Sequence, residues 1–330
     1  MMKRDYSIDL LRIVAAAMVV MIHCSGWFSF VSKEPVRDID TLVFGNAVSC
    51  AVPLFFMISG SLLLSPQYDF SLKKILYKIG KIIIILVAWG GLYAVSQIES
   101  FSFEKLLIWT FKGHFHFWFF DYLIGVYLLT PVFRALVLYE KGKYVKWFLG
   151  CWLLFGIIKY TVNGIQPHNE EIRIVTSKMT FELCNFSGYF VLGYYLSTIK
   201  EEIQKGFLLL AFLSCVVFCT LFISGNKDYQ VSTMSFTLPV VIESVTLFLL
   251  FYQMRLSEQN SSWLIPVSSA TLGIYLIHPL ILEHFLIPGV LELYPWIRVL
   301  CLWGYVFFFS LMASLLLNRI PFIRKWLLSI

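Results

Sequence analysis

Three ionisable residues, Asp9, Arg12 and His23, lie in the first long apolar run of the sequence. Arginine stays charged and binds phosphate or carboxylate through its forked guanidinium, whereas histidine can act as a general base near neutral pH. If the run is helical, the eleven-residue spacing puts Arg12 and His23 on one face, about 16 Å apart. One helix face would then carry an anion-binding cation near its start and a proton acceptor deeper in.

Each of these residues also has a purely structural interpretation. Arg12 can extend to the membrane surface and pair with Asp9, and His23 can be an interhelical hydrogen-bonding residue. An ionisable side chain within a membrane span nevertheless costs roughly 2.5–3.5 kcal/mol on insertion scales, which marks it as a functional candidate. Because the two share a face, we predict that Arg12 and His23 are catalytic residues and that Asp9 lies in the substrate site beside them.

Histidines recur at two other places in apolar sequence. His114 and His116 would point about 200° apart on a helix, so the sequence predicts no metal site there. Further along, Pro279 follows His278 and cannot donate a hydrogen bond to the carbonyl of Tyr275, which frees a polar group at membrane depth. Such an arrangement is more typical of a site than of inert packing.

Two polar residues in other apolar runs leave alternatives open. Glu243 lies midway along its run and could line a cavity as a base, pair with a buried cation, or be protonated. Ser59 is followed by Gly60, a pair that permits close helix packing, and Pro53 earlier in the same run is expected to kink the helix.

The elements that must position these residues are membrane-spanning helices. The 330 residues are 59% hydrophobic and 14% charged, whereas soluble domains have about 25% charged residues. This composition excludes an ordinary soluble enzyme, and the net charge of +6 indicates membrane topology rather than nucleic-acid binding. Apolar runs of about 20 residues predict an all-α integral membrane protein, a bundle of about ten transmembrane helices. The expected spans are residues 8–30, 42–64, 75–96, 118–139, 145–162, 180–198, 205–223, 234–254, 264–287 and 296–318.

Lysine and arginine are unevenly distributed between alternate loops. The richer side includes both ends of the chain, so both termini are predicted to be cytoplasmic, as an even number of spans requires. Residues 1–330 show no soluble segment and are expected to form a single transmembrane domain with no appended soluble domain. The connection over 101–111 has apolar residues at helical spacing and is expected to be a short helix in the membrane interface.

Four motifs follow one another along the chain. They are Arg12-x10-His23, Phe55–Gly60, His116–Phe119 and Tyr275–Pro279. In order and spacing they resemble the acyltransferase-3 family of membrane O-acyltransferases, and the resemblance covers the chain from residue 8 to about residue 318. It implies that Arg12 belongs to the acyl-CoA site and that His23 is essential. The expected substrate-binding residues are then Asp9, Ser59, His116, Trp118, Tyr275, His278 and Glu243.

The resemblance also implies a reaction. An acyl group, usually acetyl, would pass from cytoplasmic acetyl-CoA or another acyl-CoA to a hydroxyl of an envelope glycan, a lipid-linked sugar or a similar acceptor. The transfer would be direct or through a separate extracytoplasmic transferase. Lys73 and Lys74 are expected to assist Arg12 with the CoA phosphates. We expect a multi-pass protein of the bacterial cytoplasmic (inner or plasma) membrane, embedded in the lipid bilayer, with neither a metal cofactor nor a nucleic-acid partner.

A small-molecule transporter is the alternative. Broken helices and charges at mid-membrane depth also fit a transporter, and the membrane half of the vancomycin-resistance serine racemases, for which serine uptake is the proposed task, is a similar subgroup. The two halves of the sequence contain no matching pair of interrupted helices, which favours the acyltransferase interpretation.

Overall fold

The computed structural model describes residues 4–32, 38–97, 102–165, 171, 185–225 and 235–329. Within these ranges the chain is helical and contains no strand, which confirms the predicted all-α fold. The α-helices are α1 (Tyr6–Ser32), α2 (Ile39–Ala47), α3 (Ala51–Leu63), α4 (Leu72–Gln97), α5 (Phe103–Lys112), α6 (Trp118–Leu138), α7 (Val145–Trp152), α8 (Lys159–Ile165), α10 (Asn185–Ser197), α11 (Lys205–Gly225), α12 (Leu238–Tyr252), α13 (Glu258–Ser261), α14 (Leu264–His284), α15 (Pro295–Leu317) and α16 (Pro321–Trp326). The short elements are the 3-10 turns η1 (Phe115–Phe117), η2 (Tyr139–Lys141) and η5 (Val290–Glu292), and the π-helical η3 (Leu153–Ile158) between α7 and α8.

Eight helical segments of the described residues are long and apolar enough to cross a membrane. They are formed by α1, α2 with α3, α4, α6, α7 with α8, α11, α14 and α15. The other two expected spans coincide with shorter helices, because α12 has 15 residues and α10 has 13 in the described chain. A multi-pass membrane protein is therefore confirmed, whereas the count of ten and the cytoplasmic termini stay predictions.

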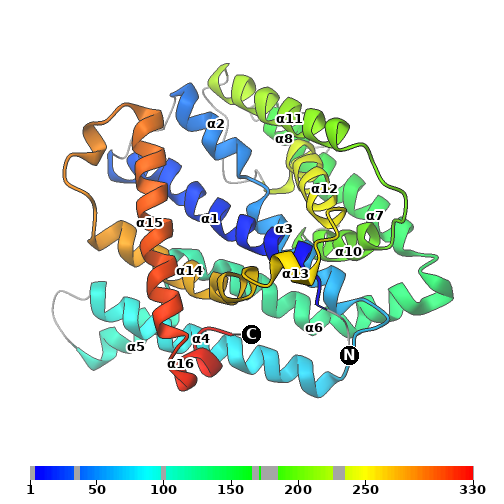
Figure 1. Ribbon diagram of the computed structural model, residues 1–330, viewed down its shortest axis with the longest axis horizontal. Coiled ribbons are helices and arrows are strands. Elements are labelled where there is room, and N and C mark those ends of the chain that lie inside the picture. Colours follow the sequence, from blue (N-terminus) through cyan, green and yellow to red (C-terminus); the bar gives the residue numbers. More distant parts are fainter. Residues whose placement is uncertain are drawn as a thin grey trace.

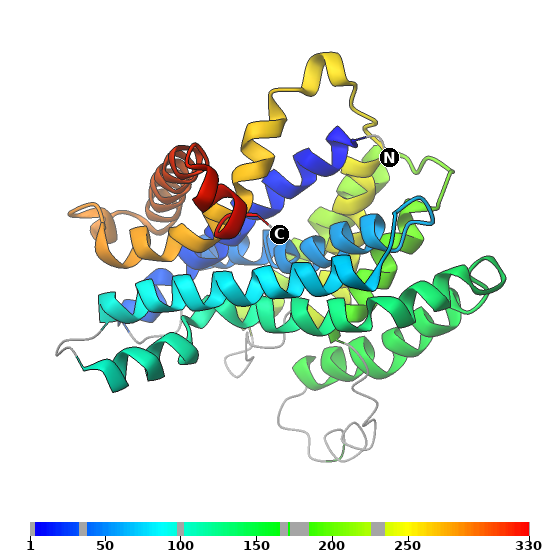
Figure 2. The ribbon, with the colours of Figure 1, turned by 90° about the horizontal axis from the view of Figure 1, so that it is seen from below.

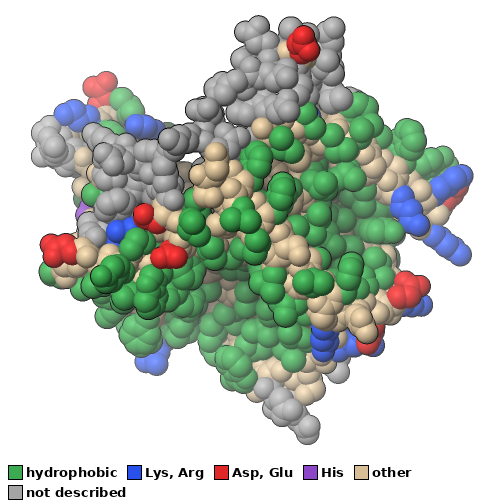
Figure 3. Space-filling model, turned by 90° about the horizontal axis from the view of Figure 1, so that it is seen from above, with side chains coloured by type: hydrophobic (Ala, Val, Ile, Leu, Met, Phe, Trp, Pro, Cys, Tyr) green, Lys and Arg blue, Asp and Glu red, His purple; other side chains and the backbone are tan. Residues whose placement is uncertain are grey.

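The outside of the bundle is apolar. Leu210 and Leu221 on α11 are 65% and 63% exposed, and Val95 on α4 is 62% exposed. Figure 3 shows one face as a broad hydrophobic surface with its charged side chains toward the edges. Lipid tails can cover such a surface without the penalty that water would impose.

Helix α1 occupies the middle of the bundle. It packs against α2, α3, α12, α14 and α15, and Figure 1 shows it enclosed by these helices. Leu11, Ala15 and Val20 on α1 are fully buried. On the other side, α4 and α6 run beside each other (Figure 2). Helix α1, which carries Asp9, Arg12 and His23, is thus shielded from lipid on most sides by its neighbours.

The span over 42–64 is broken rather than kinked. Helix α2 ends at Ala47 and α3 begins at Ala51, with a turn between them in which the Ala51 amide donates to the Val48 carbonyl at 3.0 Å. Pro53 causes this, because a proline without an N–H is tolerated in the first turn of a helix but not in its interior. The break therefore precedes the proline that was expected to bend the helix.

Helices α3 and α10 pack through glycine on both sides. A Cβ added at Gly60 would lie 1.7 Å from the carbonyl oxygen of Phe190, and one at Gly193 would lie 2.1 Å from that of Met57. The expected role of Gly60 in close packing is confirmed, and the two backbones touch where glycine alone fits.

The connection expected to be helical forms α5. Its apolar side chains remain outside, with Phe103 69% and Phe111 76% exposed. The backbone of Thr110 rests against Gly90 of α4, where an added Cβ would lie 2.5 Å from the Thr110 carbonyl oxygen. The helix is confirmed, and its place in the membrane interface stays a prediction.

Candidate functional site: a histidine cluster and an arginine cluster

Four histidines from three parts of the chain meet in one place, which we call the histidine cluster: His23 of α1, His114 and His116 at η1, and His278 of α14. The ring centroids of His23 and His278 are 5.0 Å apart, and those of His116 and His278 are 5.7 Å apart. His116 and His278 are buried, whereas His23 is partly exposed. The structure therefore brings together three residues that the sequence proposed separately, His23, His116 and His278.

The close approach of His114 and His116 corrects an expectation from the sequence. Their Nδ1 atoms lie 2.7 Å apart, although on an α-helix the two side chains would point apart. The segment is not α-helical there, because Gly113 has a φ of 69°, His114 is extended, and His116 lies in the 3-10 turn η1. Only at Trp118 does α6 begin.

Some imidazole nitrogens of the cluster have no partner among the described residues. His278 Nδ1 lies 3.1 Å from the carbonyl oxygen of Ile274, to which it must donate. Its Nε2 and the Nε2 of His116 are buried with no hydrogen-bond partner in the described chain. His23 makes ring contacts with Phe115 and His278 but no hydrogen bond to any described residue. A buried polar atom left unpaired costs about 1–3 kcal/mol, so the Nε2 atoms of His116 and His278 are better explained by a ligand than by packing.

Two tyrosines hold the histidine cluster in place. The Tyr93 hydroxyl of α4 donates to the Leu276 carbonyl at 2.8 Å, and its ring stacks on His114 at 4.1 Å. The Tyr275 hydroxyl donates to the carbonyl of His116. Tyr275 thus reaches the cluster as expected, and its bond ties α14 to η1. Because Pro279 provides no N–H, the Tyr275 carbonyl also lacks its usual helical donor.

Arg12 belongs to a second group, the arginine cluster, with Asp9, Arg4 and Ser268. Arg12 Nη1 donates to Asp9 Oδ1 and to Ser268 Oγ, both at 3.3 Å, while Ser268 Oγ donates to Asp9 Oδ1 at 2.7 Å. Arg4 Nε donates to the other oxygen of Asp9 at 2.5 Å. The pairing of Arg12 with Asp9 that the sequence allowed is therefore present.

That pairing uses only part of the Arg12 guanidinium. Both of its hydrogen bonds to described residues leave from Nη1, and the side chain is 30% exposed. The edge formed by Nε and Nη2 makes no hydrogen bond to a described residue. A guanidinium edge of this kind accommodates two phosphate oxygens at once.

Other polar groups extend the arginine cluster. Tyr127 of α6 is in electrostatic contact with Arg12 and within hydrogen-bonding reach of Ser59, which places Ser59 close by. Lys78 of α4 is also in electrostatic contact with Arg12. By contrast, the Lys74 ammonium donates to Asp69 in an exposed loop and lowers the pKa of that carboxyl. Lys78 is the cation that the sequence reasoning missed.

The two clusters lie on one face of α1, and both adjoin α14. Arg12 bonds to Ser268 and His23 packs on His278, so the predicted common face of α1 is confirmed. Helical rise places the two residues about 16 Å apart. Because both clusters lie between α1 and α14, the packing of these two helices fixes the distance between the clusters.

Two of the expected substrate-binding residues lie outside both clusters. Trp118 is 39% exposed and packs against Tyr122 and Phe186. Glu243 is fully buried, accepts a hydrogen bond from Ser49 Oγ at 2.7 Å, and has an unpartnered Oε1 among the described residues. Ser49 lies in the turn between α2 and α3.

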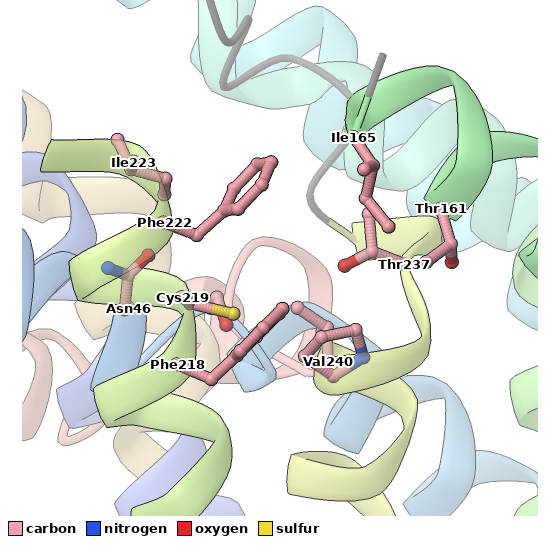
Figure 4. Close-up of a pocket in the computed structure, with 11 residues that line it drawn as sticks. Asn46, Thr161, Ile165, Phe218, Cys219, Phe222, Ile223, Thr237 and Val240 are labelled. Atoms are coloured by element: carbon pink, nitrogen blue, oxygen red, sulfur yellow. The ribbon is translucent and has the colours of Figure 1, made fainter. Parts of the chain in front are cut away.

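Ser49 also lines a small cavity of about 30 Å³. Figure 4 shows its walls, with Asn46 on α2, Cys219 and Phe222 on α11, Thr161 on α8 and Thr237 at the start of α12. Asn46 Nδ2 donates to Thr220 Oγ1 at 3.1 Å. Glu243 therefore belongs to a separate polar centre at the helix break rather than to the histidine cluster.

Sequence reasoning did not assign a role to His114, Tyr93 or Glu283. His114 Nε2 lies 3.1 Å from Glu283 Oε1. The available signal was a second histidine two positions before His116. Nothing in that spacing shows that Glu283, on a distant helix, would be its partner.

Comparisons with known proteins identify the family of the chain. The family model of the acyltransferase-3 family, described as an acyltransferase domain, matches residues 5–319. The chain is also similar to a protein named "Amino-acid racemase" from Enterococcus faecalis, with 28% identity over 310 residues. This match covers 86% of the chain and 42% of the relative, so the chain spans less than half of that protein. No solved structure matches.

The family match extends over nearly the whole chain, including the histidine cluster and, apart from Arg4, the arginine cluster. It begins before Asp9 and ends after α15, so all the helices that build the site fall inside it. The chain belongs to the acyltransferase-3 family.

Proposed function

We propose that the protein is an O-acyltransferase of the bacterial cytoplasmic membrane. It moves an acyl group, in the first instance acetyl, from cytoplasmic acyl-CoA to a hydroxyl of an envelope glycan, a lipid-linked sugar or a similar acceptor. The transfer is direct or passes through a separate extracytoplasmic transferase. The observation that carries the proposal is that Arg12 and His23 share one face of α1, with His23 beside His278, whose Nε2, like that of His116, has no partner among the described residues.

In this proposal Arg12 and Lys78 bind the phosphates of CoA, and Asp9 and Ser268 fix the guanidinium. The pantetheine arm extends along α1 and α14 toward the histidine cluster, past the aromatic rings of Phe119 and Tyr275, whose centroids are 5.4 Å apart. The thioester then lies against His23. His23 either deprotonates the acceptor hydroxyl or carries the acyl group briefly.

Transfer from labelled acetyl-CoA tests the function. Proteoliposomes containing the protein and an envelope fraction of glycans and lipid-linked sugars should form a product from which mild alkali releases acetate. The same vesicles should not take up labelled serine. Serine uptake without acetyl transfer would favour the transporter, which the chain's likeness to an "Amino-acid racemase" makes worth measuring directly.

Arg12→Ala should raise the KM for acetyl-CoA about 10- to 100-fold, because a charged hydrogen bond contributes about 1.5–3 kcal/mol. Arg12→Lys should retain part of the affinity, since lysine keeps the charge and loses the fork. Steady-state kinetics measures both effects, with the exposed Arg319→Ala as a control.

A truncated donor makes the Arg12 assignment specific. Acetyl-pantetheine lacks the pyrophosphate and the nucleotide, so Arg12→Ala should leave its KM unchanged. An equal loss of affinity for acetyl-CoA and for acetyl-pantetheine would show that Arg12 does not bind the phosphates.

A further inference from the structure

Three side chains, Glu283, His114 and His116, form a row that leads from the edge of the histidine cluster into its centre. Glu283 Oε1 lies 3.1 Å from His114 Nε2, and His114 Nδ1 lies 2.7 Å from His116 Nδ1. The side chains of His114 and Glu283 are 3% and 17% exposed, so the row runs from a partly wet carboxylate to buried rings. At its inner end, His116 Nε2 has no described partner and lies beside His278.

We propose that Glu283 and His114 are positioning residues that make His116 the proton acceptor for the attacking hydroxyl. This inference rests on the proposed acyl transfer in the case in which His23 carries the acyl group, so that a second imidazole receives the hydroxyl proton. An ionised carboxylate only accepts, so His114 Nε2 carries a proton and donates to Glu283. His114 Nδ1 is then an acceptor, His116 Nδ1 donates to it, and His116 Nε2 carries a bare lone pair.

The row moves one proton and returns it. As the acceptor hydroxyl oxygen bonds to the acyl carbon, its proton passes to His116 Nε2. The Nδ1 proton of His116 then passes to His114, which becomes an imidazolium beside the Glu283 carboxylate. When the acyl carbon separates from the His23 nitrogen, which leaves as a neutral imidazole, the proton returns along the same row to the CoA thiolate released when His23 took the acyl group. The products are an ester and CoA thiol, so protons and electrons balance.

The surroundings make Glu283 the counterion of this row. The titratable side chains that face His114 and His116 come from three helices: His23 of α1, Tyr93 of α4, and Tyr275, His278 and Glu283 of α14. Glu283 is the acidic residue among them. An imidazolium in such a place is stabilised by a carboxylate in direct contact with it.

Glu283→Gln keeps the shape of the side chain and removes its charge. Acetyl transfer in proteoliposomes should show an apparent kcat about 10²-fold lower, within the range that general acid–base catalysis contributes. The KM for acetyl-CoA should stay within about twofold of the wild type, because the arginine cluster is untouched. The acid limb of the kcat–pH profile should move to lower pH, since the protonated row has lost its anion.

Matched variants separate positioning from folding. Glu283→Asp retains the charge and should recover most of the lost kcat, and His114→Gln should resemble Glu283→Gln. His284→Gln changes the adjacent exposed residue and should behave as the wild type. Each variant is compared by its elution profile and thermal unfolding in detergent.

The outcomes are distinct. A folded Glu283→Gln with wild-type kcat and pH profile would overturn the row while leaving the acyl transfer intact. Equal losses in Glu283→Gln and Glu283→Asp would also overturn it, because the charge would then be irrelevant. If the wild-type protein transfers no acetyl group from acetyl-CoA, the proposed function is wrong, and so is the proposed role of Glu283 and His114.

Discussion

Replacing His23 with alanine is expected to reduce acetyl transfer by about 10²- to 10⁴-fold, the range for loss of a general acid–base group. His23 lies on the common face of α1 with Arg12 and makes no hydrogen bond to any described residue, so its nitrogens are available to a substrate. The measurement is acetyl transfer from labelled acetyl-CoA at saturating donor. The KM for acetyl-CoA should change little, since the phosphates bind at the other cluster.

A loss of acetyl transfer in His23→Ala can be assigned to the mechanism only if the variant is folded. Removing a partly exposed ring from a cluster with unpartnered nitrogens should leave thermal unfolding close to that of the wild type. His284→Ala, at an exposed position, provides the control for loss of a histidine as such. Full activity in a folded His23→Ala protein would remove His23 from the mechanism.

The same residue distinguishes a base from an acyl carrier. A carrier forms an acyl-imidazole without any acceptor, so labelled acetyl-CoA and unlabelled CoA should exchange in the wild type and not in His23→Ala. A base leaves no such intermediate and gives no exchange. The row from Glu283 to His116 requires the carrier, because a His23 that acts as the base would take the hydroxyl proton itself. A wild-type protein without exchange would therefore overturn the row.

Gly60→Ala is expected to have the largest effect on stability, a loss of about 3 kcal/mol or more, at the upper end for overpacking. The new methyl would lie 1.7 Å from a backbone oxygen of α10, and neither helix can rotate a side chain to make room. The measurement is thermal unfolding and the monodisperse fraction in detergent. Separation of α3 from α10 would also reduce transfer, because Ser59 adjoins the arginine cluster.

The control is the same substitution on another span. Gly80 of α4 has no atom within 4 Å of an added Cβ, so Gly80→Ala should be neutral or stabilise the helix by up to about 1 kcal/mol. Gly193→Ala, which meets the Met57 carbonyl oxygen at 2.1 Å, should resemble Gly60→Ala. Similar stabilities for Gly60→Ala and Gly80→Ala would contradict the close approach of α3 and α10.

Hydropathy and helical periodicity were sufficient to predict the spans and the relative directions of residues on one helix. Each expected span has a helix in the described chain, because a long apolar run in lipid must satisfy its own backbone. The common face of Arg12 and His23 follows from helical periodicity alone, since α1 is unbroken between them. The expectation that the side chains of His114 and His116 point apart was wrong, because helical periodicity was applied to a segment that is not α-helical.

The sequence by itself thus determined a helical membrane protein of the acyltransferase-3 family with a cation and a base on one face of its first helix. Only the tertiary structure decided that α14 faces them, that Glu283 meets His114, and that Trp118 and Glu243 lie elsewhere. Residue spacing fixes directions around one helix axis. Which helices pack against each other depends on whether their surfaces are complementary, as those of α3 and α10 are at Gly60 and Gly193. That complementarity involves two segments that are far apart in the sequence, so residue spacing within one of them does not reveal it.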